Sequence, residues 1–211
     1  MKVEIKPGFL FPTQYWTAEF NQDIKELQKE CYLIKKNDKN GTKKSNTGSQ
    51  GYHSKDVKSF DNIPETKKLI NQIGNCVSSI HQLNRKGSLY LQNFWINISG
   101  EGASNTPHYH FGCFSGVFFI KVPKNMQGGR FLFYRDFKEA SLNSQEYRGA
   151  FKEGYKLQSY DYPINIIQPK ENLLVIFPSW VLHGVETNLS NDERISLSFN
   201  ISFERTVIHD K

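Results

Sequence analysis

Residues 194–203, which read RISLSFNISF, alternate strictly between polar and apolar side chains. A period of two is that of a β-strand, in which successive side chains point to opposite faces of the sheet. The apolar face would pack on a core. The polar face could be solvated, as is usual in an antiparallel sheet, or it could line a wet cavity if the strand closes a barrel. The histidine-containing strands upstream favour the cavity.

Upstream of this strand the period of two extends back to Ser88, whereas the first part of the chain has helical spacing. Apolar side chains recur every three to four residues over 18–36 and 64–85, which predicts two amphipathic helices. Turn residues divide the remainder into candidate strands at 88–98, 107–111, 114–122, 130–135, 155–168, 172–177, 181–187 and 194–205. Two helices before about eight short strands predict a mainly β protein, a jelly-roll barrel with two flanking N-terminal helices.

No internal repeat and no clear boundary divides the 211 residues, so we expect one domain over 1–211. Its N-terminal helices and a polar loop would occupy 1–87, and the core of the β barrel would occupy 88–205. A chain of this length can bury a core without disulfide bonds.

The cysteine pattern and the N-terminus predict a cytoplasmic protein. Cys31, Cys76 and Cys113 are odd in number, widely spaced and without a CxxC motif, which is typical of a reducing compartment. The chain starts MKVEIK, which is no signal peptide, and no apolar run approaches the roughly 20 residues that span a bilayer.

The formal net charge is +6, and much of the excess lies in residues 35–44, KKNDKNGTKK. This stretch is either a solvated loop or an anion-binding patch. No basic helix interleaved with aromatic residues accompanies it, so we expect neither a nucleic-acid partner nor a membrane partner.

Three of the six histidines fall inside candidate strands. His108 and His110 are two residues apart, so both should project from one side of a strand, while His183 lies in the apolar run FPSWVLHGV. A lone histidine in such a run is usually a core residue. A His-x-His pair with a distant strand histidine instead indicates a metal site, because neutral imidazole is the commonest metal ligand.

Arg194 follows His183 by eleven residues, on the strand that should lie near it. Its planar guanidinium suits a carboxylate, and Ser196 on the same face could donate a hydroxyl to the same anion. Alternatively, Arg194 could be a surface residue paired with Asp192 or Glu193. The three histidines favour the buried carboxylate site.

These stretches together resemble one family of proteins. The matching segments are His108-Tyr109-His110, SGVFF (115–119), GGRFLF (128–133), PKENLLVIFPSWVLHGV (169–185), ERIS (193–196) and, upstream, SNTGSQGYHS (45–54). They resemble the 2-oxoglutarate- and iron(II)-dependent oxygenase superfamily. More narrowly, they resemble a family common in phage and bacterial genomes that pairs a His-x-His-then-SGV motif with FPSW…H…ERIS.

The resemblance implies that the jelly roll is a double-stranded β-helix, as in cupins. It also implies a non-haem iron(II)- and 2-oxoglutarate-dependent dioxygenase that uses O2 to hydroxylate a substrate, in the manner of prolyl hydroxylases. It implies that His108, His110 and His183 hold Fe(II). It further implies that Arg194 and Ser196 bind the distal carboxylate of 2-oxoglutarate, with Asn97 near this cosubstrate. The protein would supply positioning and a dry pocket.

The sequence departs from the superfamily at two places. An acidic residue usually stands at the position of His110, so either His110 is the third ligand or a distant carboxylate such as Asp136 replaces it. A tyrosine that binds the cosubstrate in prolyl-hydroxylase-like members would fall near Phe118 or Phe119, and here Ser196 or Tyr90 would replace it.

Two alternatives to the oxygenase hypothesis remain open. One is a cupin-like three-histidine metal dioxygenase without 2-oxoglutarate, which would not need a carboxylate site at Arg194. The other is a non-catalytic metal-binding β-barrel. The substrate would be a small molecule or a peptide, and a homodimer stays open. We expect Trp95 and Trp180 to pack in the core and His53 and His81 to lie outside the site.

Overall fold

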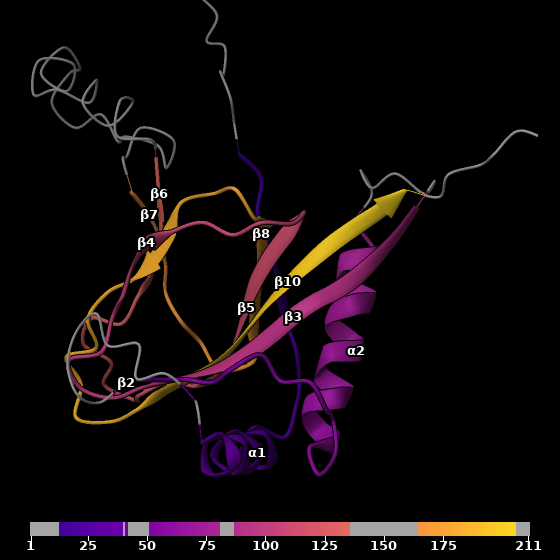
Figure 1. Cartoon of the computed structure of the whole chain (residues 1–211). Helices are drawn as coiled ribbons and strands as arrows, with labels where there is room; N and C mark the ends of the chain where they lie inside the picture. Colours follow the sequence, from indigo (N-terminus) through magenta and orange to yellow (C-terminus); the bar gives the residue numbers. More distant parts are fainter. Residues whose placement is uncertain (1–12, 40, 42–50, 81–86, 136–163, 206–211) are drawn as a thin grey trace, which may run out of the picture.

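The computed structural model describes residues 13–39, 41, 51–80, 87–135 and 164–205. In this part of the chain two helices accompany ten strands, all paired in antiparallel fashion (Figure 1). The elements are β1 (Trp16–Glu19), α1 (Ile24–Asn37), β2 (Gly51–His53), α2 (Pro64–Ser78), β3 (Gly87–Ser99), β4 (Asn105–His108), β5 (Phe114–Lys121), β6 (Phe131–Tyr134), β7 (Ile164–Ile167), β8 (Leu173–Pro178), β9 (His183–Val185) and β10 (Arg194–Arg205).

The strands form two sheets. The larger has the order β1-β8-β5-β10-β3-β2, and the smaller has the order β4-β9-β6-β7. Helices α1 and α2 pack against the larger sheet, on the side away from the smaller one (Figure 1). This arrangement confirms the predicted mainly β jelly roll with two flanking N-terminal helices.

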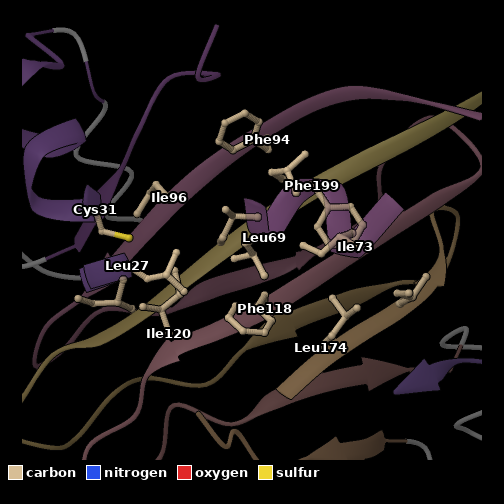
Figure 2. Close-up of a cluster of buried hydrophobic side chains, with 14 of the residues drawn as sticks. Leu27, Cys31, Leu69, Ile73, Phe94, Ile96, Phe118, Ile120, Leu174 and Phe199 are labelled. Atoms are coloured by element: carbon tan, nitrogen blue, oxygen red, sulfur yellow. The ribbon is translucent and has the colours of Figure 1, made fainter. Parts of the chain in front are cut away.

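Two apolar clusters hold these layers together. The cluster between the helices and the larger sheet joins Leu27, Cys31 and Leu69 of the helices to strand residues such as Phe118 and Phe199 (Figure 2). The second cluster lies between the two sheets and is built mainly of aromatic and β-branched side chains: Val117, Phe119, Phe131, Phe133, Ile167, Val175, Phe177 and Val181. The larger sheet is therefore buried on both faces.

Strand β10 follows its sequence pattern on both faces. The side chains of Ile195, Leu197, Phe199 and Ile201 enter the cluster beneath the helices. Arg194, Ser196 and Ser198 line a cavity on the opposite face. The sequence left this polar face either solvated or cavity-lining, and the structure confirms the cavity.

Helix α1 is fixed to α2 by a buried carboxylate. Glu30 accepts hydrogen bonds from the main-chain N–H groups of Glu65 (2.9 Å) and Thr66 (2.7 Å) and from the Thr66 hydroxyl (2.7 Å). These amides are among the unpaired donors at the start of α2, where negative charge is favourable. Glu30 thus acts as a cap supplied by the neighbouring helix.

Several predicted boundaries were wrong at the start of the chain. Residues 16–19 form β1 on the edge of the larger sheet, and α1 begins only after Asp23, whose side chain accepts N–H groups of the first turn. The second helix ends at Ser78, and strand β2 lies within the polar loop expected between the two helices. Of the strand expected at 155–168, residues 164–167 form β7 and residues 155–163 lie outside the described part.

No helix in the described part of the chain is long and apolar enough to cross a membrane.

Candidate metal and carboxylate site

Three histidines gather where β4 and β9 pair in the smaller sheet. His108 ends β4 and lies directly opposite His183, the first residue of β9. His110 follows two residues later, beyond the end of β4, so the expected strand over 107–111 stops at His108. One nitrogen from each of the three imidazoles lies within 4.8 Å of the others. The three side chains predicted from the sequence are therefore brought together.

Two of the imidazoles are oriented by the main chain. His108 Nδ1 is 2.7 Å from the Thr106 carbonyl oxygen, and His183 Nδ1 is 2.8 Å from that of Val181. A carbonyl oxygen only accepts, so each Nδ1 carries the proton and donates it. Each ring consequently presents the lone pair of Nε2, in the tautomer and fixed orientation that metal-bound histidines usually have.

The His183 imidazole is neutral at physiological pH. Burial lowers its pKa to about 3, with the neighbouring His108 and His110 adding to the decrease and the hydrogen bond to Val181 opposing it. Neutral imidazole is the form that binds a metal. Imidazole ligands suit iron among other transition metals.

The histidines lie on the wall of a cavity of about 410 Å³ between the two sheets. Its volume is within the range of about 300–1,000 Å³ found for small-molecule sites. The larger sheet contributes Asn97 and Trp95 from β3 and Arg194 and Ser196 from β10. All six residues predicted for metal or cosubstrate binding therefore border one cavity.

Arg194 is a buried cation. Its side chain is 4% exposed, and Nη1 donates to the Gly129 carbonyl oxygen at 3.0 Å. Nε has no hydrogen-bond partner, and within the described part of the chain no carboxylate forms an ion pair with the guanidinium. Burial lowers the pKa of Arg194 to about 10, which leaves it charged at neutral pH. A buried charge of this kind is costly unless an anion joins it.

The alternative of a surface ion pair for Arg194 is wrong. Asp192 instead accepts from Lys121 Nζ at 2.6 Å, and Glu193 accepts from the Tyr32 hydroxyl at 2.5 Å. Both acidic residues belong to exposed contacts. The Arg194 guanidinium, which borders the cavity without an anionic partner in the described part of the chain, could therefore bind the carboxylate of a ligand.

Ser196 and Asn97 are partners across β10 and β3, and Ser196 is fully buried. Asn97 Nδ2 donates to the Ser198 hydroxyl at 3.0 Å, which fixes its amide on the cavity wall. Tyr90, the other residue considered as a hydroxyl donor, is half-exposed and does not border the cavity. Phe118 turns toward the helices, and Phe119 faces the cavity side with its ring 5.9 Å from the Arg194 guanidinium carbon.

One wall of the cavity, formed by β2, was not predicted from the sequence. His53 was expected outside the site, but β2 places it beside Asn97, with its ring stacked on Trp95 at 5.5 Å between ring centroids. A three-residue strand inside a polar loop gives no periodic signal. The sequence feature that could have placed His53 at the site was the resemblance of residues 45–54 to the oxygenase family, because β2 lies within these residues. Trp180, expected in the core, is 67% exposed, whereas Trp95 is buried as expected. Asp136 and His81 lie outside the described residues.

The comparison with protein families agrees with this geometry. Residues 93–200 match the family described as "Putative 2OG-Fe(II) oxygenase". The chain belongs to this family of 2-oxoglutarate- and iron(II)-dependent oxygenases. Its metal is therefore iron(II), and 2-oxoglutarate and dioxygen are its cosubstrates. No curated protein matches the chain.

Solved structures of oxygenases share the fold. A Pseudomonas putida prolyl-4-hydroxylase is 15% identical over 92% of this chain and 94% of its own, with a TM-score of 0.57. A Trichoplax adhaerens prolyl hydroxylase, in complex with a hypoxia inducible factor peptide fragment, is 13% identical over 90% and 83%, with a TM-score of 0.60. The alpha-ketoglutarate-dependent epimerase SnoN from nogalamycin biosynthesis is 11% identical over 90% and 78%, with a TM-score of 0.61. At these identities the likeness shows the fold alone.

Proposed function

We propose that this oxygenase is a hydroxylase whose iron(II) is held by His108, His110 and His183 and whose 2-oxoglutarate is held by Arg194. The observation that carries the proposal is the buried Arg194 guanidinium. Its Nε has no partner, and it borders the same cavity as three convergent imidazoles. A metal alone would not require this charge, whereas an oxoacid with a distal carboxylate would satisfy it.

Each cavity residue has a distinct part in this proposal. His108 and His183 would each bind the metal through Nε2, because the Nδ1–H group of each ring donates a hydrogen bond to a main-chain carbonyl oxygen. Arg194 offers Nε to the carboxylate, and Ser196, two residues further on the same face, adds a hydroxyl. Asn97, fixed by Ser198, borders the cosubstrate from β3.

Bound iron(II) and 2-oxoglutarate would supply the oxidising chemistry that inserts oxygen from O2 into a C–H bond. The chain orients the reactants and limits access of water. Phe131 and Phe177 pack at 5.6 and 4.6 Å from the His183 ring, so the buried side of the cluster is apolar. An apolar wall strengthens the electrostatic interactions of the site.

We extend the proposal to features of the chain beyond the site. The substrate would be a small molecule or a peptide, as for the prolyl hydroxylases that share the fold. Residues 1–211 would form a single oxygenase domain in the cytoplasm of a bacterium or phage host, and the free thiols of Cys31, Cys76 and Cys113 suit that compartment.

The test is an anaerobic titration of the metal-free protein with iron(II) followed by 2-oxoglutarate. A weak visible charge-transfer band should appear only when both are present, and with the variant Arg194→Ala it should require at least about a hundredfold more 2-oxoglutarate. A band that appears in Arg194→Ala at the same 2-oxoglutarate concentration as in the wild type would refute the role of Arg194. Iron binding by the wild type without any binding of 2-oxoglutarate would favour the cupin-like three-histidine alternative.

A further inference from the structure

Two buried serines form a hydrogen bond inside the protein, and both belong to sequence motifs that supply no proposed metal or 2-oxoglutarate ligand. Ser115 begins the SGV motif on β5, and Ser179 belongs to FPSW, just after β8. Their hydroxyl oxygens are 3.0 Å apart, and both side chains are buried. The proposed iron and 2-oxoglutarate ligands do not explain why hydroxyls should stand at these two positions.

The serine pair is the end of a longer row of hydrogen bonds. Ser115 Oγ donates to Asn200 Oδ1 at 2.7 Å, and Asn200 Nδ2 donates to Asn93 Oδ1 at 2.9 Å. Asn93 Nδ2 then donates to the Asp56 carboxylate at 3.2 Å. Asn93, Asn200 and Ser115 are neighbours in register across β3, β10 and β5, so the row crosses the larger sheet.

Every bond in this row points the same way. The Ser115 hydroxyl has one proton, and Asn200 Oδ1 can only accept it. The Ser179 hydroxyl therefore supplies the proton shared with Ser115. All donors point toward the Asp56 carboxylate, which gives the row a single arrangement of protons and fixes each side chain.

The other end of the row holds the segment that carries His110. The His110 N–H donates to the Ser179 carbonyl oxygen at 2.9 Å, and the Ser179 N–H donates to the Cys113 carbonyl oxygen at 3.2 Å. Ser179 is thus joined to residues 110 and 113 by its main chain and to Ser115 by its side chain. Its position fixes where the chain runs after β4.

His110 is placed by a different part of the chain from the other two histidines. His108 and His183 are placed by the direct pairing of β4 with β9, whereas His110 lies beyond the end of β4. We infer that the row Ser179–Ser115–Asn200 is a positioning device for His110, which sets the place of the third metal ligand. The inference rests on the proposed role of His110 in metal binding.

The test uses Ser115→Ala and Ser179→Ala, which remove one hydroxyl each, with Co(II) as a spectroscopic metal probe. Ser115→Thr is the rescue variant, because it keeps the hydroxyl and Ser115 borders the cavity, where the site is less closely packed. Thr66→Val is the matched control, because it removes a buried hydroxyl that donates to Glu30 in the helical layer. The readouts are Co(II) affinity, the Co(II) visible spectrum and hydrogen exchange of the His110 amide without metal.

Both alanine variants should bind Co(II) about tenfold more weakly, within the range found for supporting residues around metal ligands. Their Co(II) spectra should change and the His110 amide should exchange faster. Ser115→Thr should behave as wild type, and Thr66→Val should lower the melting temperature without altering any of the three readouts. The inference would be overturned if the two alanine variants gave the same Co(II) affinity, Co(II) spectrum and His110 amide exchange as the wild type. It would also be overturned if Thr66→Val changed these three readouts as much as the alanine variants do.

Failure of the proposed function gives a different result. A wild-type protein that binds no Co(II) would refute the three-histidine metal site. The exchange of the His110 amide would then still decide the inference: faster exchange in the two alanine variants alone would support the positioning of this segment, and unchanged exchange would overturn it.

Discussion

His108 and His183 lie directly opposite each other on the paired strands β4 and β9, although far apart in sequence. Their ring centroids are 4.4 Å apart, and each ring donates its Nδ1 proton to a main-chain carbonyl. Strand pairing therefore sets the spacing of the two imidazoles, and the two main-chain bonds set their orientation. Little of this geometry depends on a bound metal.

From this geometry we predict that His183→Ala weakens Co(II) binding by at least about a hundredfold, because losing a ligand should cost as much as losing its strongest supporting contacts. His110→Asp should retain binding, since a carboxylate can replace the third imidazole. Isothermal titration calorimetry measures both. His53→Ala is the control, because His53 borders the same cavity but lies outside the cluster, and its Co(II) affinity should not change. Equal losses in His53→Ala and His183→Ala would contradict the assignment of ligands.

Arg194→Ala should reduce 2-oxoglutarate affinity by at least about a hundredfold. Removing one member of a buried charged pair typically costs about 3–5 kcal/mol, and each 1.4 kcal/mol is tenfold in affinity. Arg194→Lys should restore only part of it, because an ammonium lacks the planar pair of donors. Calorimetry under anaerobic conditions with iron(II) present measures the affinities. Arg130→Ala, which removes a half-exposed partner of Glu186, should bind as wild type.

In the absence of 2-oxoglutarate, the buried charge of Arg194 should lower the free energy of unfolding. Burial lowers its pKa, so folding disfavours the charged form, and at neutral pH this lowers the free energy of unfolding. We predict that Arg194→Met melts at a higher temperature than wild type in the absence of 2-oxoglutarate. With Mn(II) present in both samples, addition of the oxoacid should stabilise the wild type more than Arg194→Met, as followed by differential scanning fluorimetry. A lower melting temperature for ligand-free Arg194→Met would show that the charge is already compensated.

The sequence predicted the elements whose pattern is long and regular. The alternation of β10 assigned Ile195 and Phe199 to the core and Arg194 and Ser196 to the cavity, because a strand has two distinct faces. His108 and His183 could be assigned to one site because a His-x-His pair together with a distant strand histidine indicates a metal site, whereas a lone histidine in an apolar run is usually a core residue. These assignments needed only local chemistry and the resemblance to a family.

What could not be predicted depends on contacts between distant segments. The three residues of β2 become a strand only because β3 offers them an edge, so His53 gave no signal of its own. The row from Ser179 to Asp56 joins five residues from separate parts of the chain, and serine and asparagine are equally common in loops. Trp180 is exposed although it lies in a mainly apolar stretch of sequence, because the chain leaves the sheet after Pro178.

Glu30→Ala should lower the free energy of unfolding by about 2–4 kcal/mol, because three hydrogen bonds to a buried charged group are lost and the first turn of α2 loses its cap. Urea denaturation followed by circular dichroism measures the loss. Glu26→Ala on the exposed side of α1 is the control, since its ion pair with Lys29 should contribute at most about 0.5 kcal/mol. Comparable losses in the two variants would contradict the capping role of Glu30.

Two glycine substitutions should change stability in opposite directions. In Gly116→Ala the new methyl carbon would overlap the Phe199 ring and come within 2.7 Å of the Val175 carbonyl oxygen, so β5 would be pushed from its neighbours. Overpacking of this kind costs about 1–3 kcal/mol or more. In Gly74→Ala the methyl carbon meets no atom within 4 Å, and alanine in a helix such as α2 gains about 0.5–1 kcal/mol over glycine. Thermal unfolding should therefore show a lower melting temperature for Gly116→Ala and a higher one for Gly74→Ala. If Gly116→Ala were as stable as wild type, close packing of β5 against β10 would not require a glycine in the SGV motif.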